Sequence, residues 1–147
     1  MTEPPLPLLL ARGIGRLLAQ LGYASLTEVA LANGRRADLM GLGRGGEIVI
    51  VEIKSSVADF RADGKWPEYR EFCDRFYFAV DAAFPRALIP EDCGLIVADG
   101  FGAAILREAP DLALAAARRR AVTLRFGLTG AARLRRIIDP GAEELPF

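Results

Sequence analysis

The stretch that most constrains the fold is residues 47–56, which read Glu-Ile-Val-Ile-Val-Glu-Ile-Lys-Ser-Ser. Its first part is almost entirely apolar and β-branched, which is typical of a strand buried on both faces. Glu52 and Lys54 interrupt this run, and because they are two residues apart their side chains leave the strand on the same face. Charged side chains at the inner end of a buried strand cost free energy unless they pair or bind a ligand. The alternative is a solvated ion pair at a fraying strand end.

Length and composition indicate a single globular domain, residues 1–147, with a loose tail from about residue 140. The chain is 52% hydrophobic and 26% charged, which suits an ordered protein with a substantial core. Its net charge is zero, so any nucleic-acid binding requires a local basic patch. Seventeen of its 19 basic residues are arginine, and the two lysines are Lys54 and Lys65.

The residue types that are missing exclude several kinds of chemistry. Histidine is absent, which excludes Ser-His-Asp and Cys-His catalysis and the usual zinc sites. Cys73 and Cys93 are too far apart for a metal-ligand pair, and two cysteines do not make a disulfide framework. The apolar piece at residues 6–11 is too short for a signal peptide or a membrane span. We therefore expect a cytoplasmic protein whose chemistry depends on Asp, Glu, Lys, Tyr or Ser with a hard metal.

The remaining pattern predicts an αβββαβ core, followed by further strands and a basic helix. Asn33-Gly34 is a hairpin signal, and the glycines at 41, 43, 45 and 46 precede a strand, which argues against a nucleotide-binding loop. The first three strands are expected to form an antiparallel meander, and Gly13 and Gly15 could allow the first helix to pack closely on a sheet. Helices are predicted at 7–21, from Ser56, at 67–72 and from about 110 to 138, and strands at 26–32, 36–42, 47–54, 75–80, 94–98 and 102–107.

Three charged side chains can meet within this core. Asp38 lies in the second predicted strand, and antiparallel pairing can bring it beside Glu52. Two carboxylates placed side by side repel each other unless a cation lies between them, and Mg²⁺ or Mn²⁺ suits such ligands. Lys54 could orient or deprotonate an attacking water. These groups suit metal-assisted phosphodiester hydrolysis, with a structural ion-pair cluster as the alternative.

These residues resemble known nuclease sequences. Asp38 followed by Glu52-Ile53-Lys54 resembles the signature of the PD-(D/E)XK nucleases, with Ala37 in place of the usual proline. The longer string at 34–38, 51–56, 59–60, 63, 65–69 and 73–80 resembles the MmcB family of bacterial DNA-repair endonucleases. This resemblance implies an α/β, restriction-endonuclease-like three-layer fold with a central mixed sheet.

The resemblance also implies a function, a metal-dependent DNA endonuclease that acts in repair. Asp38, Glu52 and the Ile53 carbonyl would bind Mg²⁺ or Mn²⁺, and Lys54 would position the water. The expected partner is DNA that is damaged, branched or partly single-stranded, and other repair proteins or a homodimer remain open. A non-catalytic nucleic-acid- or partner-binding module with the same fold is the alternative.

Further residues are candidates for metal or DNA contacts. Glu28 could be a third carboxylate ligand or an exposed edge residue. Lys65 and Tyr69 have the spacing of one helix face, similar to the Gln-x-x-x-Tyr element of RecB-like nucleases, and could contact the scissile phosphate or form a solvated face. The candidate DNA-binding arginines are Arg35 and Arg36 on the first hairpin and Arg118, Arg119 and Arg120 on the C-terminal helix, where a solvated face is the alternative.

Other polar and aromatic residues in this region have structural interpretations. Asp59 and Asp63 are expected to cap a helix and to form a turn, and Ser56 is expected at a helix N-cap. Trp66 is expected to pack in the core rather than to stack on a base.

Overall fold

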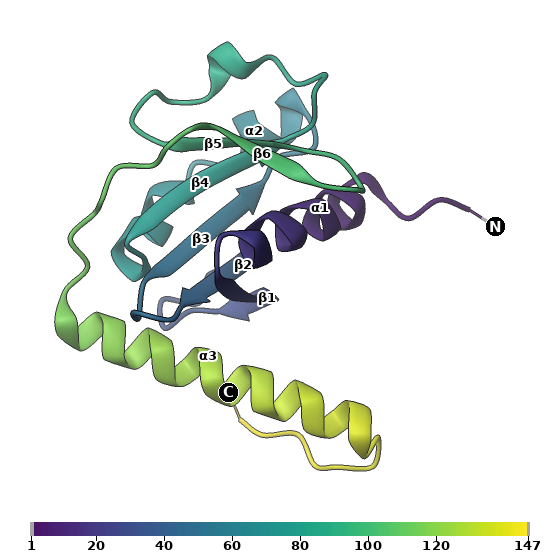
Figure 1. Ribbon diagram of the computed structural model, residues 1–147, viewed down its shortest axis with the longest axis vertical. Helices are drawn as coiled ribbons and strands as arrows, with labels where there is room; N and C mark the ends of the chain where they lie inside the picture. The colour runs from purple at the N-terminus through teal and green to yellow at the C-terminus, as the bar shows by residue number, and fades with distance from the viewer. Residues whose placement is uncertain (1, 147) are drawn as a thin grey trace.

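A single six-stranded sheet, in the order β1-β2-β3-β4-β5-β6, forms the centre of the protein (Figure 1). The computed structural model describes residues 2–146. The strands are β1 (Tyr23–Ala30), β2 (Arg36–Gly43), β3 (Ile48–Ile53), β4 (Arg75–Val80), β5 (Gly94–Ala98) and β6 (Ala103–Arg107). The helices are α1 (Leu6–Gln20), α2 (Val57–Ala62) and α3 (Ala116–Ile138), with the short 3₁₀ helices η1 (Trp66–Phe72) and η2 (Arg86–Leu88).

The sheet is mixed. β1, β2 and β3 form the predicted antiparallel meander. β3, β4 and β5 are parallel, because α2 and η1 carry the chain from the end of β3 back to the start of β4. β6 returns antiparallel to β5 as the second strand of the predicted hairpin. The predicted mixed α/β fold, with helices flanking a central sheet, is confirmed.

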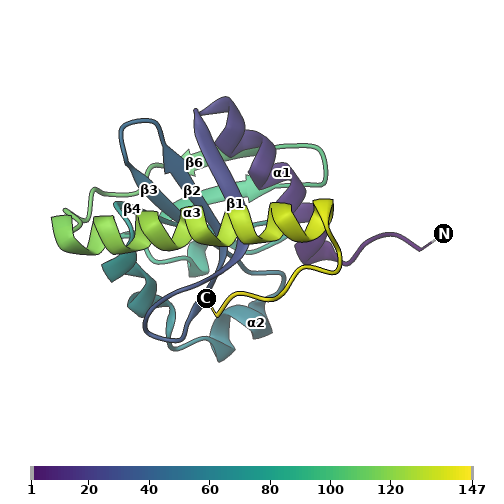
Figure 2. The same cartoon turned by 90° about the horizontal axis from the view of Figure 1, so that it is seen from below.

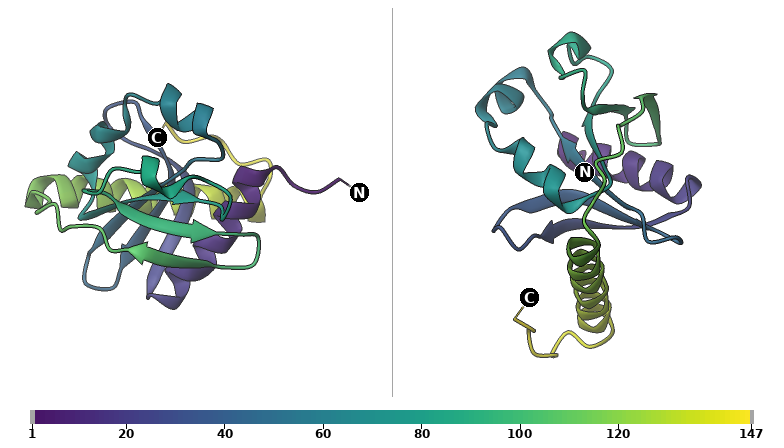
Figure 3. Two further views of the ribbon diagram at one scale, coloured as in Figure 1. Left: turned by 90° about the horizontal axis from the view of Figure 1, so that it is seen from above. Right: turned by 90° about the vertical axis from the view of Figure 1, so that its left-hand side faces the viewer.

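Two hydrophobic clusters, one on each side of the sheet, explain why every residue of β3 is buried. Val49 and Val51 belong to the cluster that α1 covers, and Ile48 and Ile50 belong to the cluster that includes Phe72 of η1. The right-hand view of Figure 3 shows the sheet between these helices. The continuous apolar run at 48–51 is therefore the sequence of a strand with no solvent-facing side.

α1 approaches the β5–β6 hairpin very closely at Gly13. A Cβ atom at this position would lie 2.0 Å from the Asp99 carbonyl oxygen and 2.5 Å from that of Gly102. Gly15 has no such neighbour, since the nearest atom to a Cβ there would be Ser25 Oγ at 4.0 Å. The predicted close packing of the first helix is therefore confirmed at Gly13 and not at Gly15.

The prediction for the first strand was wrong in two respects. β1 begins at Tyr23 rather than at residue 26, and it ends at Ala30. The strand is also irregular: Leu26 and Val29, which are an odd number of residues apart and would face opposite sides of a regular strand, pack on the same hydrophobic cluster. The cause is Glu28, whose φ of +52° places it in the left-handed region and interrupts the pleat.

The C-terminal helix also begins later than expected. Leu112 donates a backbone hydrogen bond of 2.8 Å to the Asp74 carbonyl, and Ala113 has a φ of +51°. These features hold residues 108–115 in an extended path, and α3 starts only at Ala116. The helix then continues through Gly127 and Gly130 and lies beside β1 (Figure 2).

The segment at 67–72 is a 3₁₀ helix rather than an α-helix. Because a 3₁₀ helix has three residues per turn, residues four apart do not share a face. Lys65 precedes η1 and is exposed, whereas Tyr69 is buried. The expectation that Lys65 and Tyr69 lie on one helix face was therefore wrong.

Within residues 2–146, the structure contains no helix that is both long and apolar enough to cross a membrane.

Candidate active site

Asp38 and Glu52 lie opposite each other on the central antiparallel pair. The register Leu39↔Val51 makes them the next residues along β2 and β3. The backbone N–H of Asp38 donates to Glu52 Oε1 at 2.9 Å, and the backbone N–H of Ile53 donates to Asp38 Oδ2 at 2.8 Å. Each carboxylate is thus held by the strand that carries the other.

This enclosed position changes the protonation of the pair. Burial, followed by the charge of Asp38, raises the pKa of Glu52 to about 9. Burial also raises the pKa of Asp38, and the charge of Glu28 raises it further, although the hydrogen bond from Ile53 opposes these effects. At neutral pH the pair therefore carries less than two negative charges.

Lys54 lies one residue beyond β3, where its N–H donates to the Ala79 carbonyl at 2.9 Å. Its side chain is only 7% exposed, and its Nζ donates to Asp63 Oδ2 at 2.7 Å. Asp59 Oδ1 is further away, at 4.0 Å from the same nitrogen. A buried ammonium in this position depends on Asp63 for its compensating charge.

Asp63 is therefore a member of the site that the sequence did not identify. It was expected to be a turn residue, and it does accept the N–H of Lys65 at 2.8 Å. Burial alone would raise its pKa, but the hydrogen bonds from Lys54 and Lys65 reverse this and lower it. No sequence pattern signals the pair, because the contact depends on how α2 folds back over the end of β3.

Asp38, Glu52 and Lys54 line one cavity of about 350 Å³. The sequence prediction that these three side chains converge is therefore confirmed by the geometry. The cavity lies between the end of β3, the start of α1 and the start of α2. Its remaining lining residues are Pro7, Leu8, Ala11, Thr27, Glu28, Ile53 and Asp59.

Glu28 lies at the edge of this cavity. It lies between the pairs Thr27↔Leu39 and Val29↔Ala37, which places it opposite Asp38. Its exposed carboxylate lies 3.9 Å from the Arg36 guanidinium. Glu28 is thus both an edge residue and a neighbour of the carboxylate pair.

The oxygen donors that the sequence predicted for a metal ion, on Asp38, Glu52, Ile53 and Glu28, all belong to residues that line this cavity, together with Thr27 and Asp59. No group of three or more His, Cys, Asp or Glu side chains is arranged to hold a metal ion in the part of the chain from 2 to 146. A pair of carboxylates nevertheless suits Mg²⁺, which usually keeps several waters and takes only one or two carboxylates.

The predicted phosphate-binding residues on the first hairpin are tied to η1. Arg35 Nε donates to Glu68 Oε2 at 2.7 Å, and the Tyr69 hydroxyl donates to the Arg36 carbonyl at 3.0 Å. Burial, then the charges of Glu52 and Asp38, raises the pKa of Tyr69 to about 12. Tyr69 therefore positions the backbone of Arg36, while the side chains of Arg36 and Lys65 remain exposed.

The three arginines at the start of α3 do not form one patch. Arg118 lies over the ring of Phe72, with 4.3 Å from its Cζ to the centroid. Arg119 binds both oxygens of Asp74 at 2.5 and 2.6 Å and also donates to the Gly46 carbonyl. Arg120 is exposed. Arg119 therefore fastens α3 to the sheet.

The aromatic and capping residues near the site have the structural contacts that were expected. Trp66 stacks on Phe76 at 5.9 Å between centroids. Ser56 Oγ accepts the N–H of Asp59 at 3.0 Å and caps α2, while Asp59 accepts the N–H of Ser55 at 3.1 Å. These contacts fix the start of α2 beside the cavity.

Comparison with known proteins gives a consistent result over nearly the whole chain. A family model described as DNA repair protein MmcB-like matches residues 3–141. The solved structure of a protein of unknown function from Silicibacter pomeroyi is 43% identical, covers 99% of this chain and 100% of its own, and has a TM-score of 0.93. No curated protein matches the sequence at a significant level. The chain therefore belongs to the MmcB-like family of DNA repair proteins.

Proposed function

We propose that this protein is a metal-dependent DNA endonuclease of the PD-(D/E)XK type that acts in DNA repair. The observation that carries the proposal is the carboxyl pair of half-buried Asp38 and buried Glu52, which shares one cavity with the ammonium of Lys54. A carboxylate pair of this kind is costly to ionise unless a cation compensates its charge. Perturbed pKa values with a specific cause are common at catalytic sites.

In this proposal Asp38, Glu52 and the Ile53 carbonyl hold Mg²⁺ or Mn²⁺, with Glu28 as an outer carboxylate. The bound ion would supply Lewis-acid stabilisation of the negative charge that develops on the phosphate. The backbone hydrogen bonds from Asp38 and Ile53 fix the two carboxylates before the ion arrives. Such preorganisation reduces the reorganisation that binding and catalysis require.

Lys54 has a separate part in the proposed reaction. Its ammonium is held by Asp63 at 2.7 Å, so its position does not depend on a substrate. From the wall of the cavity it would orient the attacking water by hydrogen bonding.

The DNA would approach the cavity over the exposed basic residues around it. Arg35 and Arg36 on the first hairpin and Lys65 before η1 are the nearest of the predicted set, with Tyr69 acting through the Arg36 backbone. Arg118 and Arg120 lie further away, on α3, and Arg119 is committed to Asp74. Contacts with phosphates fix the position of a protein on DNA and do not select a base sequence.

A non-catalytic DNA-binding module is the second candidate, and one observation favours it. The ammonium of Lys54 already has a carboxylate partner in Asp63, so the cavity is a satisfied ion-pair network without a metal. Under this candidate the carboxylates of Asp38 and Glu52 would stabilise the β2–β3 pair and need never bind an ion.

A cleavage assay separates the two candidates. Wild-type protein would be incubated with Mg²⁺ or Mn²⁺ and labelled duplex, nicked, flapped and branched DNA, alongside Asp38→Asn and a Glu91→Gln control on an exposed loop. We expect wild type and the control to cleave at least one substrate, and Asp38→Asn to cleave none. Binding of DNA without cleavage of any substrate would favour the module.

A further inference from the structure

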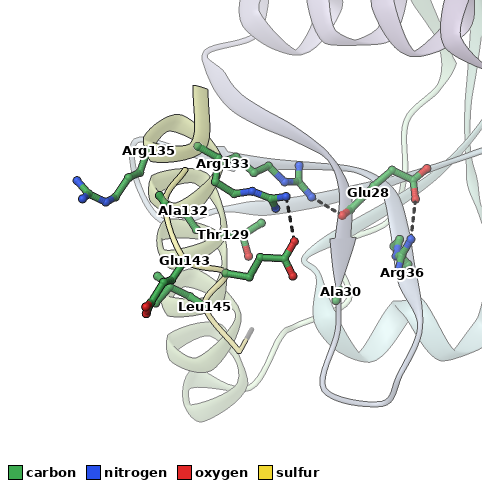
Figure 4. Close-up of a pocket in the computed structure, with 12 residues that line it drawn as sticks. Glu28, Ala30, Arg36, Thr129, Ala132, Arg133, Arg135, Glu143 and Leu145 are labelled. Atoms are coloured by element: carbon green, nitrogen blue, oxygen red, sulfur yellow. Dashed lines mark hydrogen bonds and ion pairs between the residues drawn. The ribbon is translucent and has the colours of Figure 1, made fainter. Parts of the chain in front are cut away.

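A second cavity, of about 340 Å³, lies between β1 and the C-terminal half of α3 (Figure 4). We call it the arginine groove. Its charged lining comprises four arginines and three glutamates, and two of the glutamates belong to the C-terminal tail. The charged residues are Glu28, Arg36, Arg133, Arg135, Arg136, Glu143 and Glu144.

The walls of the groove are held together by Arg133. Its guanidinium donates to the Thr27 carbonyl and to the Glu28 carbonyl on β1. β1 is an edge strand, and these contacts satisfy carbonyl groups that no neighbouring strand can pair. The C-terminal half of α3 is thus fixed beside β1, with space between them.

The groove is adjacent to the candidate active site. Glu28 lines both cavities. Arg36 pairs with Glu28 at 3.9 Å and is two residues from Asp38 on the same strand. A chain of phosphates lying in the groove would therefore reach the carboxylate pair without leaving the surface of β1 and β2.

The tail of the protein occupies this groove by means of an acidic side chain. Backbone hydrogen bonds within 139–142 reverse the chain direction after α3, which brings the tail back alongside the helix (Figure 2). Arg136 then donates to Glu144 Oε1 at 3.0 Å. Both side chains are more than half exposed, at 54% and 77%, so this ion pair contributes little stability.

We propose that the arginine groove binds the sugar-phosphate backbone of DNA and leads it to the active site, and that Glu144 occupies Arg136 until DNA displaces it. The inference rests on the proposed function for the identity of the ligand as DNA. DNA is a stronger partner for these arginines than one exposed carboxylate, because it presents a row of phosphates, each able to accept bidentate hydrogen bonds, whose summed charge attracts basic residues over a long range. Displacing Glu144 would leave Arg136 without its carboxylate partner, beside Arg36 and Arg133 and with only the carboxylate of Glu28 on the wall that β1 forms.

The chain provides matched controls for both halves of this proposal. Arg135 is adjacent to Arg136 but points away from β1, and Glu143 likewise points away from the groove (Figure 4). Arg136 and Glu144 instead pair with each other at 3.0 Å. Arg136→Ala and Arg135→Ala therefore remove the same charge at the same end of α3. Glu144→Gln and Glu143→Gln likewise each remove one negative charge from the C-terminal tail.

The test measures binding alone, in EDTA, by fluorescence anisotropy of a labelled duplex and a labelled single strand over a series of salt concentrations. Arg136→Ala should weaken binding more than Arg135→Ala and lower the salt slope by about 0.9 for duplex or about 0.7 for single strand. Glu144→Gln should tighten binding up to about fivefold relative to Glu143→Gln, since it removes an exposed ion pair. In the double variant Arg136→Ala/Glu144→Gln, the effect of Glu144→Gln should disappear.

Equal effects of the two arginine variants, equal effects of the two glutamate variants, or no binding of DNA by wild type would each overturn the proposal. Thermal unfolding of the four single variants and the double variant checks that the fold is retained. Because no metal is present, the result is separate from cleavage. If wild type cleaved no DNA but the variants differed in binding as expected, only the nuclease proposal would be overturned. If wild type cleaved DNA but the variants did not differ in binding, only the proposal for the arginine groove would be overturned.

Discussion

The backbone N–H of Asp38 donates a 2.9 Å hydrogen bond to the carboxylate of Glu52, across the β2–β3 pair. The N–H of Ile53 donates in the opposite direction, to Asp38. The two carboxyl groups are therefore positioned by the ladder of the central sheet and not by loops. Groups fixed on such rigid elements keep their geometry whether or not a ligand is present.

Glu52→Gln should make the metal-free protein more stable at neutral and alkaline pH. The pKa of Glu52 is raised from 4.5 to about 9 in the fold, so the native state retains a proton that the unfolded chain loses between these values. The contribution of the protonated Glu52 is fully present below pH 4.5 and is lost as the pH rises through about 9. Glutamine keeps the neutral form throughout, and we expect a gain of roughly 2 kcal/mol at pH 8.

Thermal unfolding in EDTA at pH 5 and pH 8 would check this prediction. From pH 5 to pH 8, wild type should become less stable relative to Glu52→Gln. Glu91→Gln, on an exposed loop, should show the same change in stability as wild type. If Glu52→Gln were less stable than wild type at pH 8, Glu52 would be ionised in the metal-free protein.

Binding of Mn²⁺ at neutral pH should release protons. In the metal-free protein the raised pKa of Glu52 keeps a proton on its carboxyl group at neutral pH, and a metal ligand must give up its proton when the ion binds. Titration calorimetry in two buffers of different ionisation enthalpy would measure the number released. We expect wild type to release between zero and one proton per Mn²⁺ ion bound, and we expect Glu52→Gln not to bind Mn²⁺. Binding without any release would show that the pair is already ionised.

The sequence was a good guide where one strong pattern decides the structure. The apolar run at 48–51 has no polar face, so only a strand between two layers can accommodate it. The tight turn before it sets an antiparallel register, and that register places Asp38 opposite Glu52. The convergence of these two carboxylates with Lys54 was predictable for this reason.

The sequence was a poor guide where tertiary contacts override local preference. Nothing near Glu28 indicates that it takes a positive φ, since glutamate rarely does so. The start of α3 is delayed because Leu112 bonds to Asp74, which is distant in the sequence. Asp63 reaches Lys54 only because α2 folds over the end of β3.

Gly13→Ala and Gly15→Ala should have opposite effects on stability. A Cβ at residue 13 would lie 2.0 Å from a backbone oxygen of the β5–β6 hairpin, so α1 or the hairpin must move, at a cost of about 2–4 kcal/mol. At residue 15 there is room, and alanine should add up to about 1 kcal/mol through its higher helix propensity. Urea unfolding of both variants gives the comparison, and equal effects would contradict the close approach.

Arg119→Ala should destabilise the fold, whereas Arg120→Ala should not. Arg119 makes a bidentate ion pair with Asp74, which also accepts the N–H of Ile48 at 2.8 Å. The hydrogen bonds from Arg119 lower the pKa of Asp74, so this carboxylate contributes stability above its unfolded pKa of 3.8 and loses it as the pH falls further. We expect Arg119→Ala to cost about 1–3 kcal/mol at pH 7.

Acid titration of unfolding would test the same pair. The difference in stability between wild type and Arg119→Ala should shrink as the pH falls below 3.8, because Asp74 is then protonated in the unfolded chain and progressively in the fold. A constant difference at all pH values would mean that Arg119 acts through packing alone. Arg120 is exposed and serves as the control on the same helix turn.

Lys54→Ala should abolish cleavage while leaving DNA affinity in EDTA nearly unchanged, because the ammonium is enclosed in the wall of the cavity. Lys54→Arg should also fail, since a guanidinium is larger and directs its donors differently. Removing Lys54 leaves Asp63 partly buried without its partner, at an expected cost of about 1–3 kcal/mol. Lys65, the other lysine, is exposed, so Lys65→Ala should keep wild-type stability.

The double variant Lys54→Ala/Asp63→Asn separates the structural contribution of the ion pair from its part in catalysis. Because the unpaired charge is gone, this variant should recover most of the stability lost in Lys54→Ala, as measured by urea unfolding. Its cleavage activity with Mn²⁺ should remain absent, since no ammonium is left to orient the attacking water. If the recovered fold cleaved DNA as wild type does, Lys54 would have only a structural role. The carboxylates of Asp38 and Glu52 would then have to account for the chemistry without it.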